Sequence, residues 1–358
     1  MNWLLLLALV LGMQTSFVSC SSEHDNPVVV VPDDQQEVLN YINRANLRET
    51  ISDEERDALY APFAWRLEVK DTDEMPFNFH WCGDEFNFET ETSQELPEVG
   101  YVPSRQGLDD LQISGSARFT AMQLKQLCDW LKTKANGKPI YIVDLRNECH
   151  GFVNGHHMSQ YGFQNWANIG KTKERIVAEE NALFASLPGQ TILYGKIGSS
   201  TNYELADSTW AEIIAEQTMT EEQAVTAMGL RYQRITALDH VFPTDQIIDS
   251  YLEFYHSLPQ DCWLHFHCQA GRGRTTLYMS FTDMLRNPDV PLKDILYRQC
   301  LIGGSSMLND GTGQPEWRVD LFKEINVLVP VLYEYVQDNV ANGYIVPWSV
   351  WKKQKYNL

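Results

Sequence analysis

The stretch WLHFHCQAGRGRTT at residues 263–276 begins as a mostly apolar run, turns at two glycines and leads into RTTLYMSFTDMLRN, residues 274–287. A short apolar run of this kind is typical of a strand covered on both faces, and we expect the second segment to continue as a helix. The backbone N–H groups of such a turn point inward, and the start of the helix adds partial positive charge. The sequence therefore predicts an anion-binding loop, a P-loop, between a buried strand and a helix.

The side chains of this loop indicate nucleophilic chemistry. Cys268 begins the loop and Arg274 ends it, and the loop amides, the helix dipole and Arg274 together favour a thiolate. The planar guanidinium of Arg274 can contact two phosphate oxygens at once. Thr275 can hydrogen-bond the sulfur, and Gly271 and Gly273 allow unusual backbone angles and close approach of a phosphate. We predict that Cys268, Arg274 and Thr275 are catalytic; the alternative is a buried structural cysteine beside a tight turn.

A second segment, TALDHVFP at residues 236–243, supplies a candidate acid. Attack of a thiolate on a phosphate ester requires a group that protonates the leaving oxygen. This segment follows the expected strand at residues 231–235, and Pro243 stiffens it. Asp239 is the predicted general acid, and His240 either positions it or contacts the substrate. The alternative for Asp239 is an ordinary turn or capping aspartate.

The overall charge limits the partners of the chain. Of 358 residues, 44% are hydrophobic and 21% charged, which is typical of a globular protein, and the formal net charge is −20. Such an acidic chain is not expected to bind nucleic acid through bulk charge. We predict a small anionic molecule as the partner, and it requires a local basic pocket that overrides the repulsive overall field.

The first twenty residues read as an export signal. Residues 1–20 contain an apolar run that is short for a membrane span, followed by small polar residues, as in a secretory signal peptide. The ending FVSC resembles a bacterial lipobox, although Phe17 stands where leucine is usual. We therefore expect an exported chain that is periplasmic, secreted or attached to the membrane through a lipidated Cys20. The alternative is an uncleaved hydrophobic anchor.

The seven cysteines form no CxxC pair, so the spacing predicts neither a zinc site nor thioredoxin chemistry. We expect no metal and no cofactor, and the pairing of the cysteines stays open. His156 and His157 would indicate a metal only if carboxylates converge on them, and they are expected in a solvated loop.

The rest of the chain alternates between helix and strand, which indicates an α/β fold. Residues 21–60 are expected to be a polar lead-in and residues 61–358 the catalytic domain, with an inserted smaller lobe around 150–215. ISGSA at residues 113–117 is expected to be a turn. Helices are predicted at 119–133, 171–187, 220–230, 243–258 and 274–287, and strands at 140–146, 191–197, 231–235 and 262–268.

Five motifs together resemble a known family. They are IYIVDLRNECHGFVNG (140–155), NWANIGKTKE (165–174), LDHVFPT (238–244), LPQDCWLHFHCQAGRGRTT (258–276) and GYIVPWSVW (343–351). They are similar to the bacterial cysteine phytases, which belong to the protein tyrosine phosphatase superfamily. The resemblance implies a central mixed sheet flanked by helices, with a small partial β-barrel. It also implies metal-independent removal of phosphates from myo-inositol hexakisphosphate through a phosphocysteine intermediate.

The resemblance also assigns residues. It makes Cys268 the nucleophile, Asp239 the acid and Arg274 the phosphate clamp, and Lys171 matches a substrate-contacting lysine. The other predicted substrate contacts are Gln269, Ala270, Gly271, Arg272, Gly273, His240 and Arg105.

Four positions depart from the family pattern. Gln269 replaces a common glutamate and Arg272 a small apolar residue, and both changes favour an anionic substrate. His80 and Asp320 stand where basic residues are expected. Arg118 is as readily a surface arginine as a substrate contact, and so is Arg105, while Arg146 is either in the pocket or in a core salt bridge.

Three other functions remain open. The first is a phosphotyrosine or phospholipid phosphatase of the same superfamily. The second is a polyphosphate-binding module that has lost turnover. The third is a rhodanese-like sulfurtransferase, which requires neither Asp239 nor Thr275.

Overall fold

The computed structural model describes residues 35–62, 64–195 and 210–358. The predicted signal segment and Cys20 lie outside the described residues. The helices in the described part are α1 (Gln35–Leu47), α2 (Asp53–Tyr60), α3 (Glu91–Gln94), α4 (Ala121–Ala135), η1 (Phe163–Asn165), α5 (Lys173–Ser186), α6 (Glu221–Ala227), α7 (Asp245–Ser257), α8 (Gly273–Arg286), α9 (Leu292–Leu301), α10 (Glu316–Asn339), η3 (Val340–Asn342) and α11 (Trp348–Tyr356). The strands are β1 (Ala64–Val69), β2 (His80–Trp81), β3 (Ile113–Ala117), β4 (Ile140–Asp144), β5 (His150–Val153), β6 (His156–Tyr161), β7 (Thr191–Gly195), β8 (Ala211–Ile214), β9 (Thr218–Thr220), β10 (Arg231–Arg234) and β11 (Trp263–Cys268).

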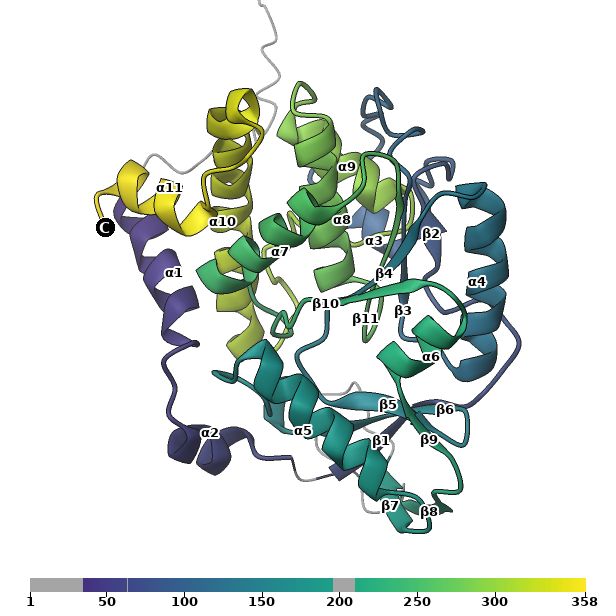
Figure 1. Cartoon of the computed structure of the whole chain (residues 1–358). Coiled ribbons are helices and arrows are strands. Elements are labelled where there is room, and N and C mark those ends of the chain that lie inside the picture. The colour runs from purple at the N-terminus through teal and green to yellow at the C-terminus, as the bar shows by residue number, and fades with distance from the viewer. Residues whose placement is uncertain (1–34, 63, 196–209) are drawn as a thin grey trace, which may run out of the picture.

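A five-stranded central sheet carries the predicted loop. Its order is β10-β4-β11-β3-β2, with β2 antiparallel and the other neighbours parallel. Helices α4 and α6 cover one face and α7 and α8 the other (Figure 1). Because the strand β11 lies in the middle of this sheet, its carboxyl end is held from both sides.

The predicted helices and strands are confirmed to within a few residues at their ends. The N-terminus of α4 illustrates why the local sequence was sufficient. Thr120 accepts a hydrogen bond from the backbone N–H of Gln123, and the Gln123 side chain accepts one from the backbone N–H of Thr120. This capping box satisfies two N–H groups that a helix start leaves without partners.

The prediction of a turn at ISGSA is wrong, because these residues form the buried strand β3 beside β11. Small residues are needed there for packing. A Cβ at Gly115 would lie 2.6 Å from Met279 Sδ and 2.7 Å from Thr275 Cγ2. The hydroxyls of Ser114 and Ser116 contact the two ring nitrogens of His265 at 2.9 and 3.0 Å. The serine hydroxyls are therefore hydrogen-bonded inside the sheet. The sequence predicts a turn because glycine and serine are common in turns.

A second, six-stranded sheet lies against the first at its loop end (Figure 1). Its order is β8-β7-β1-β6-β5-β9, antiparallel except for β1 with β7. Residues 150–195 and 211–214 supply four of its strands and α5, while β1 and β9 come from outside the predicted lobe. Among the described residues β8 and β9 do not pair with each other. The mixed α/β fold predicted from the sequence is confirmed.

The end of the predicted lead-in forms two helices. Val38, Ile42 and Ala45 recur at helical spacing on α1 and are buried in the main core, where α1 packs against α10. Arg48 donates two hydrogen bonds of 2.7 Å to Glu324 on α10. Residues 35–47 are thus packed into the main core of the described chain. In the part of the chain that the structure describes, no helix is both long and apolar enough to cross a membrane.

Candidate active site

The loop between β11 and α8 has the backbone that a phosphate cradle needs. Gly271 has φ +68°, and a Cβ there would lie 2.3 Å from the backbone nitrogen of Ala117. Both observations require glycine, because an L side chain is strained in this region and the neighbouring strand leaves no space. Gly273 has no positive φ and no atom near its missing Cβ. The conformational role predicted for both glycines therefore applies to Gly271 alone.

Cys268 lies at the carboxyl end of β11, with 3% of its surface exposed, in the wall of a cavity of about 590 Å³. Thr275 Oγ1 donates a hydrogen bond to Cys268 Sγ over 3.2 Å, as the sequence predicts. The loop carbonyls are held from outside: Arg118 Nη1 donates to Gln269 O at 2.9 Å, and Asn78 Nδ2 donates to Ala270 O at 2.8 Å. Because these carbonyls are already hydrogen-bonded, Cys268 lies in a loop whose backbone is held in place without a ligand.

Arg274 is clamped by Glu148, a residue that the sequence analysis missed. The Nη1 and Nη2 atoms of Arg274 donate to the two carboxylate oxygens of Glu148 at 2.9 and 3.1 Å. Burial alone would raise the pKa of Glu148, but Arg274 and Arg146 lower it well below its usual range. The signal was its position just after β4, because the carboxyl ends of neighbouring parallel strands meet at one edge of the sheet.

Asp239 faces the same guanidinium. Its Oδ2 lies 3.2 Å from Arg274 Nη2 and accepts a hydrogen bond from Asn165 Nδ2 over 3.1 Å. Trp166 Nε1 donates to the backbone carbonyl of Asp239 at 2.9 Å, and His240 follows with φ +70°. Burial raises the pKa of Asp239, yet the positive charge of Arg274 and then of His240 outweighs it, so the pKa is lowered. The carboxyl group is therefore ionised at rest and shares Arg274 with Glu148.

The cavity wall has more basic than acidic side chains although the whole chain is acidic. Five arginines line it, Arg66, Arg118, Arg272, Arg274 and Arg318, against the three carboxylates of Glu68, Glu95 and Asp239. The Nε atoms of Arg274 and Arg318 are buried and make no hydrogen bond with any described residue. A buried donor without a partner is costly, so these groups are suited to an anion. The local basic pocket that the net charge of −20 demands is present.

Most of the predicted site residues meet in this cavity. Its wall contains Asp239, His240, Cys268, Gln269, Ala270, Arg272, Gly273 and Arg274. Gly271 and Thr275 lie just behind it and shape it. The structure does not bring Arg105 there: its guanidinium donates to the carbonyls of Cys82 and Asp84 at 3.1 and 3.0 Å.

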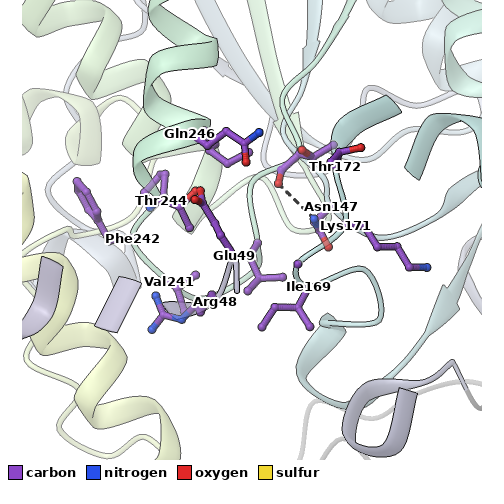
Figure 2. Close-up of a pocket in the computed structure, with 15 residues that line it drawn as sticks. Arg48, Glu49, Asn147, Ile169, Lys171, Thr172, Val241, Phe242, Thr244 and Gln246 are labelled. Atoms are coloured by element: carbon purple, nitrogen blue, oxygen red, sulfur yellow. Dashed lines mark hydrogen bonds between the residues drawn. The ribbon is translucent and has the colours of Figure 1, made fainter. Parts of the chain in front are cut away.

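Lys171 also lies elsewhere. It lines a separate cavity of about 140 Å³, next to Val241, Phe242 and Thr244 of the loop that carries Asp239 (Figure 2). Its ammonium donates to Asn168 Oδ1 at 2.9 Å and to Glu179 at 2.6 Å. In this structure the lysine is thus on the far side of the acid loop from Cys268, and its charge is already paired.

The structure locates three residues whose roles the sequence left undecided, Arg118, Arg146 and His80. Arg118 lines the cavity, whereas Arg146 is fully buried in ion pairs with Glu68 and Glu148 at 2.7 Å. His80 is buried, and burial lowers its pKa to about 4, so it cannot replace a substrate-binding arginine.

One further position lies away from the cavity. Asp320 is largely exposed and lies 3.5 Å from Arg44. The six cysteines in the described part are all unpaired and buried.

The expectation of a solvated loop at His156 and His157 is wrong for His157. Both residues are on β6, and His157 is fully buried with Nδ1 3.3 Å from Glu68 Oε2. Side chains alternate between the faces of a strand, so adjacent histidines cannot both point outward. His156 is only partly buried, and its Nδ1 accepts a hydrogen bond from the backbone of Asp71.

A family model and several solved structures show similarity of this chain to the same group of proteins. The family model of the protein tyrosine phosphatase-like phytases, described by the words inositol hexakisphosphate, matches residues 143–286. Among solved structures, the chain is similar to the tandemly repeated protein tyrosine phosphatase-like phytase from Mitsuokella multacida, with 38% identity and a TM-score of 0.76. That similarity covers 82% of this chain and 49% of the other. The Mitsuokella enzyme has also been solved in complex with myo-inositol-(1,3,4,5)-tetrakisphosphate.

Two other relatives extend this picture. A phytase of the same type from Bdellovibrio bacteriovorus is 27% identical, with a TM-score of 0.59 over 81% of this chain and 95% of that one. The effector protein hopD2 of Pseudomonas syringae pv. tomato is 24% identical over 264 residues, which are 73% of this chain and 55% of hopD2. The chain thus spans about half the length of hopD2 and of the Mitsuokella phytase. In its motifs, in its fold and in these matches, the chain is similar to the protein tyrosine phosphatase-like phytases.

Proposed function

We propose that this protein hydrolyses phosphate monoesters of myo-inositol polyphosphates through a phosphocysteine intermediate. The observation that carries the proposal is the position of Cys268 in the wall of a cavity lined by five arginines. A substrate with several phosphates can use several guanidiniums at once, whereas a monophosphate uses little beyond the loop itself. The Mitsuokella relative, which was solved with an inositol tetrakisphosphate, supports this class of substrate.

In the first step, Cys268 Sγ attacks phosphorus and the bond from phosphorus to the inositol oxygen breaks. Arg274 and the loop amides hold the other phosphate oxygens, where charge resides in the transition state. A bound phosphate takes over contacts of Arg274 and adds negative charge beside Asp239. Both effects raise the pKa of Asp239, so the carboxyl group gains the proton that it then gives to the leaving oxygen.

In the second step, Asp239 accepts a proton from water, and the water oxygen attacks phosphorus. The bond between sulfur and phosphorus breaks, and inorganic phosphate leaves. The hydrogen bond from Thr275 Oγ1 to Sγ stabilises the departing thiolate. Thr275 thus assists the step that regenerates the enzyme.

Phosphate release from inositol hexakisphosphate tests the proposal, with a simple aryl phosphate as the comparison. Wild type should release phosphate from both and have the higher kcat/KM on the inositol ester. Cys268→Ser should release none and should still bind the substrate. Asp239→Asn should still form the phosphocysteine on the aryl ester, because its good leaving group does not need the acid.

Three outcomes would contradict the proposal. Release from aryl phosphates alone would favour a phosphotyrosine type of phosphatase. Binding without release from any ester would favour a polyphosphate-binding module. Sulfur transfer without phosphate release would favour the rhodanese-like alternative.

We also propose that the chain is exported and that Cys20 is either lipid-modified or removed with the signal segment. The support is the apolar run and the FVSC sequence at residues 17–20. Mass spectrometry of the protein from its native cell envelope tests this. An intact, unmodified N-terminus would overturn the proposal.

A further inference from the structure

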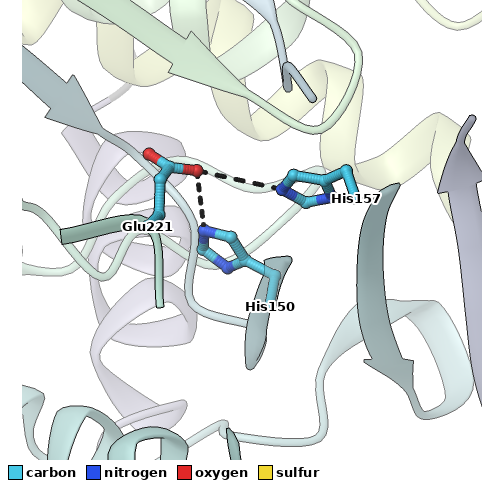
Figure 3. Close-up of side chains that lie close together, drawn as sticks. All are labelled: His150, His157 and Glu221. Carbon is cyan, nitrogen blue, oxygen red and sulfur yellow. Dashed lines mark ion pairs between the residues drawn. The ribbon is translucent and has the colours of Figure 1, made fainter. Parts of the chain in front are cut away.

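A buried cluster of histidines lies directly behind the catalytic loop, at the contact between the two sheets. His150 is on β5, His157 on β6 and His267 on β11, and Glu221 is the first residue of α6. Glu221 Oε2 lies 3.3 Å from His150 Nε2 and 3.8 Å from His157 Nε2 (Figure 3), and Glu221 Oε1 lies 2.6 Å from His267 Nε2. All four side chains are fully buried.

Glu221 differs from the other carboxylates of the buried network in its counter-charges. Each of the others has a guanidinium within ion-pair distance, whereas the ion pairs of Glu221 in the described part of the chain are with histidines alone. The guanidinium pairs are Glu68 with Arg66 and Arg146, Glu148 with Arg146 and Arg274, Asp144 and Glu180 with Arg234, and Asp239 with Arg274. A buried carboxylate is costly without a cation. The charge that compensates Glu221 must therefore be an imidazolium or a bound ion.

The two histidines in Figure 3 are oriented as metal ligands are. His150 Nδ1 donates to the backbone carbonyl of Glu148 at 2.8 Å, which leaves the lone pair of a neutral ring on Nε2. Arg146 Nη1 lies 3.4 Å from His157 Nε2 and can only donate, so that lone pair is also on Nε2, and an ion there would replace this long contact. Nδ1 of His157 faces the Glu68 carboxylate at 3.3 Å. A ring nitrogen that faces a carbonyl or carboxylate, with the lone pair on the other nitrogen, is the usual arrangement around a protein-bound metal.

The inner atoms of the cluster lack hydrogen bonds. Both carboxylate oxygens of Glu221 and the Nε2 atoms of His150 and His267 are buried and form none with any described residue. The carboxylate of Glu221 therefore lies close to the ring nitrogens of His150 and His267, but these contacts do not have the geometry of hydrogen bonds. Buried polar atoms without partners need an explanation, and an ion is one.

We propose that His150 Nε2, His157 Nε2 and Glu221 bind one divalent transition-metal ion of the zinc class. Two imidazoles and a carboxylate are ligands that zinc prefers. Zinc bonds of about 2.1 Å in a tetrahedron place ligand atoms roughly 3.4 Å apart, close to the 3.3 and 3.8 Å observed here. Asp144 Oδ2, 3.1 Å from His150 Nε2, is the nearest further oxygen.

The ion would have a structural role, because it would connect the two sheets, and it would not act on substrate. Strands β5 and β6 belong to the second sheet, and α6 covers the central sheet. One ion would thus link the two sheets beside His267, the residue before the nucleophile. The sequence does not predict this site, because its ligands are distant in the chain and no spacing motif connects them.

The test uses the full chain with Cys268→Ser, so that the catalytic thiolate cannot bind zinc. The protein is stripped with EDTA, and binding of Zn²⁺ alone is measured by equilibrium dialysis and by the thermal unfolding midpoint. We expect about one equivalent per chain and a higher midpoint with zinc. His157→Gln in the same background should lower zinc affinity at least about tenfold and abolish the shift. His156→Gln removes a histidine from the other face of β6 and should behave as the parent.

Two results would overturn the proposal. In one, the stripped parent takes up no zinc at micromolar concentrations, and an imidazolium then balances Glu221. In the other, His157→Gln binds zinc as tightly as His156→Gln does. If His157→Gln does not fold, the parent with Co²⁺ decides, because a tetrahedral site of imidazole and carboxylate gives visible absorption bands and their absence contradicts the site. Phosphate release is not a readout here, so failure leaves the proposed function untouched.

Discussion

Arg274 is shared by two carboxylates in the resting site, and this explains the state of Asp239. The same guanidinium holds Glu148, faces Asp239 and has a buried Nε without a partner. The pKa of Asp239 is lowered as long as its carboxylate shares this charge. In the proposed mechanism, a phosphate that engages Arg274 raises this pKa, so substrate binding is coupled to protonation of Asp239.

This coupling predicts a pH-dependent effect of Asp239→Asn. Because the pKa of Asp239 is lowered in the free enzyme, its protonated fraction falls as pH rises through that pKa. The ratio of wild-type to variant kcat/KM on inositol hexakisphosphate should reach about 100- to 10,000-fold in acid and decrease as pH rises. Steady-state kinetics from pH 3 to 7 measure it, and ionisation of the substrate cancels in the ratio. A ratio that stays constant with pH would contradict the role of Asp239 as acid.

Arg272 is exposed at the rim of the cavity and forms no ion pair with any residue that the structure describes. Arg272→Val should raise KM for inositol hexakisphosphate by about two- to fivefold, as expected for one solvated charge, and change KM for an aryl monophosphate less. Lys125→Val, on the exposed face of α4 and outside the cavity, makes the same change in net charge and is the control. Equal losses on both substrates would show that Arg272 acts on the loop itself.

At the scale of elements, the loop depends on its neighbour β3 as much as on its own residues. The backbone of Ser116 and Ala117 lies against Gly271, so the small residues of β3 leave the space that the loop occupies. This contact is also why ISGSA forms a strand, since Gly115 and the serines fit between β11, Met279 and His265.

Replacing Gly271 or Gly273 with alanine tests whether only position 271 requires glycine. Gly271→Ala should destabilise the protein by about 1–3 kcal/mol, because it strains the backbone and meets β3, and it should weaken binding of vanadate, a phosphate mimic. Gly273→Ala should be as stable as wild type or up to about 1 kcal/mol more stable, because alanine favours the start of a helix. Urea unfolding and vanadate titration measure the pair. Equal stability of the two variants would refute the requirement for glycine at position 271.

At the scale of the whole molecule, the N-terminal helix belongs to the same core as the active site. Helix α1 packs on α10, and the Arg48 and Glu324 pair links them. Glu324 Oε1 also accepts a hydrogen bond from the backbone N–H of Phe242, in the loop that carries Asp239. The N-terminal segment therefore supports the position of the acid loop.

Ile42→Ala tests this packing. The side chain is 2% exposed in the main core, so its truncation should cost about 2–5 kcal/mol of unfolding free energy. Asn43→Ala, on the exposed face of the same helix, should change stability by less than about 0.5 kcal/mol. Urea denaturation provides both values. A small effect of Ile42→Ala would show that α1 is a detachable tether.

The sequence by itself determined how Cys268, Arg274 and Thr275 lie relative to one another, because they belong to one strand, loop and helix whose local pattern specifies their geometry. It also determined the resemblance to the phytases, through motifs that are each contiguous in the chain. Only the tertiary structure decided which distant charges face them, including the clamp on Arg274 by Glu148 and the cluster around Glu221. It also placed Arg105 and Lys171 outside the main cavity. Pairing through space depends on strand order and on how two sheets meet, and neither is encoded in the spacing of residues along the chain.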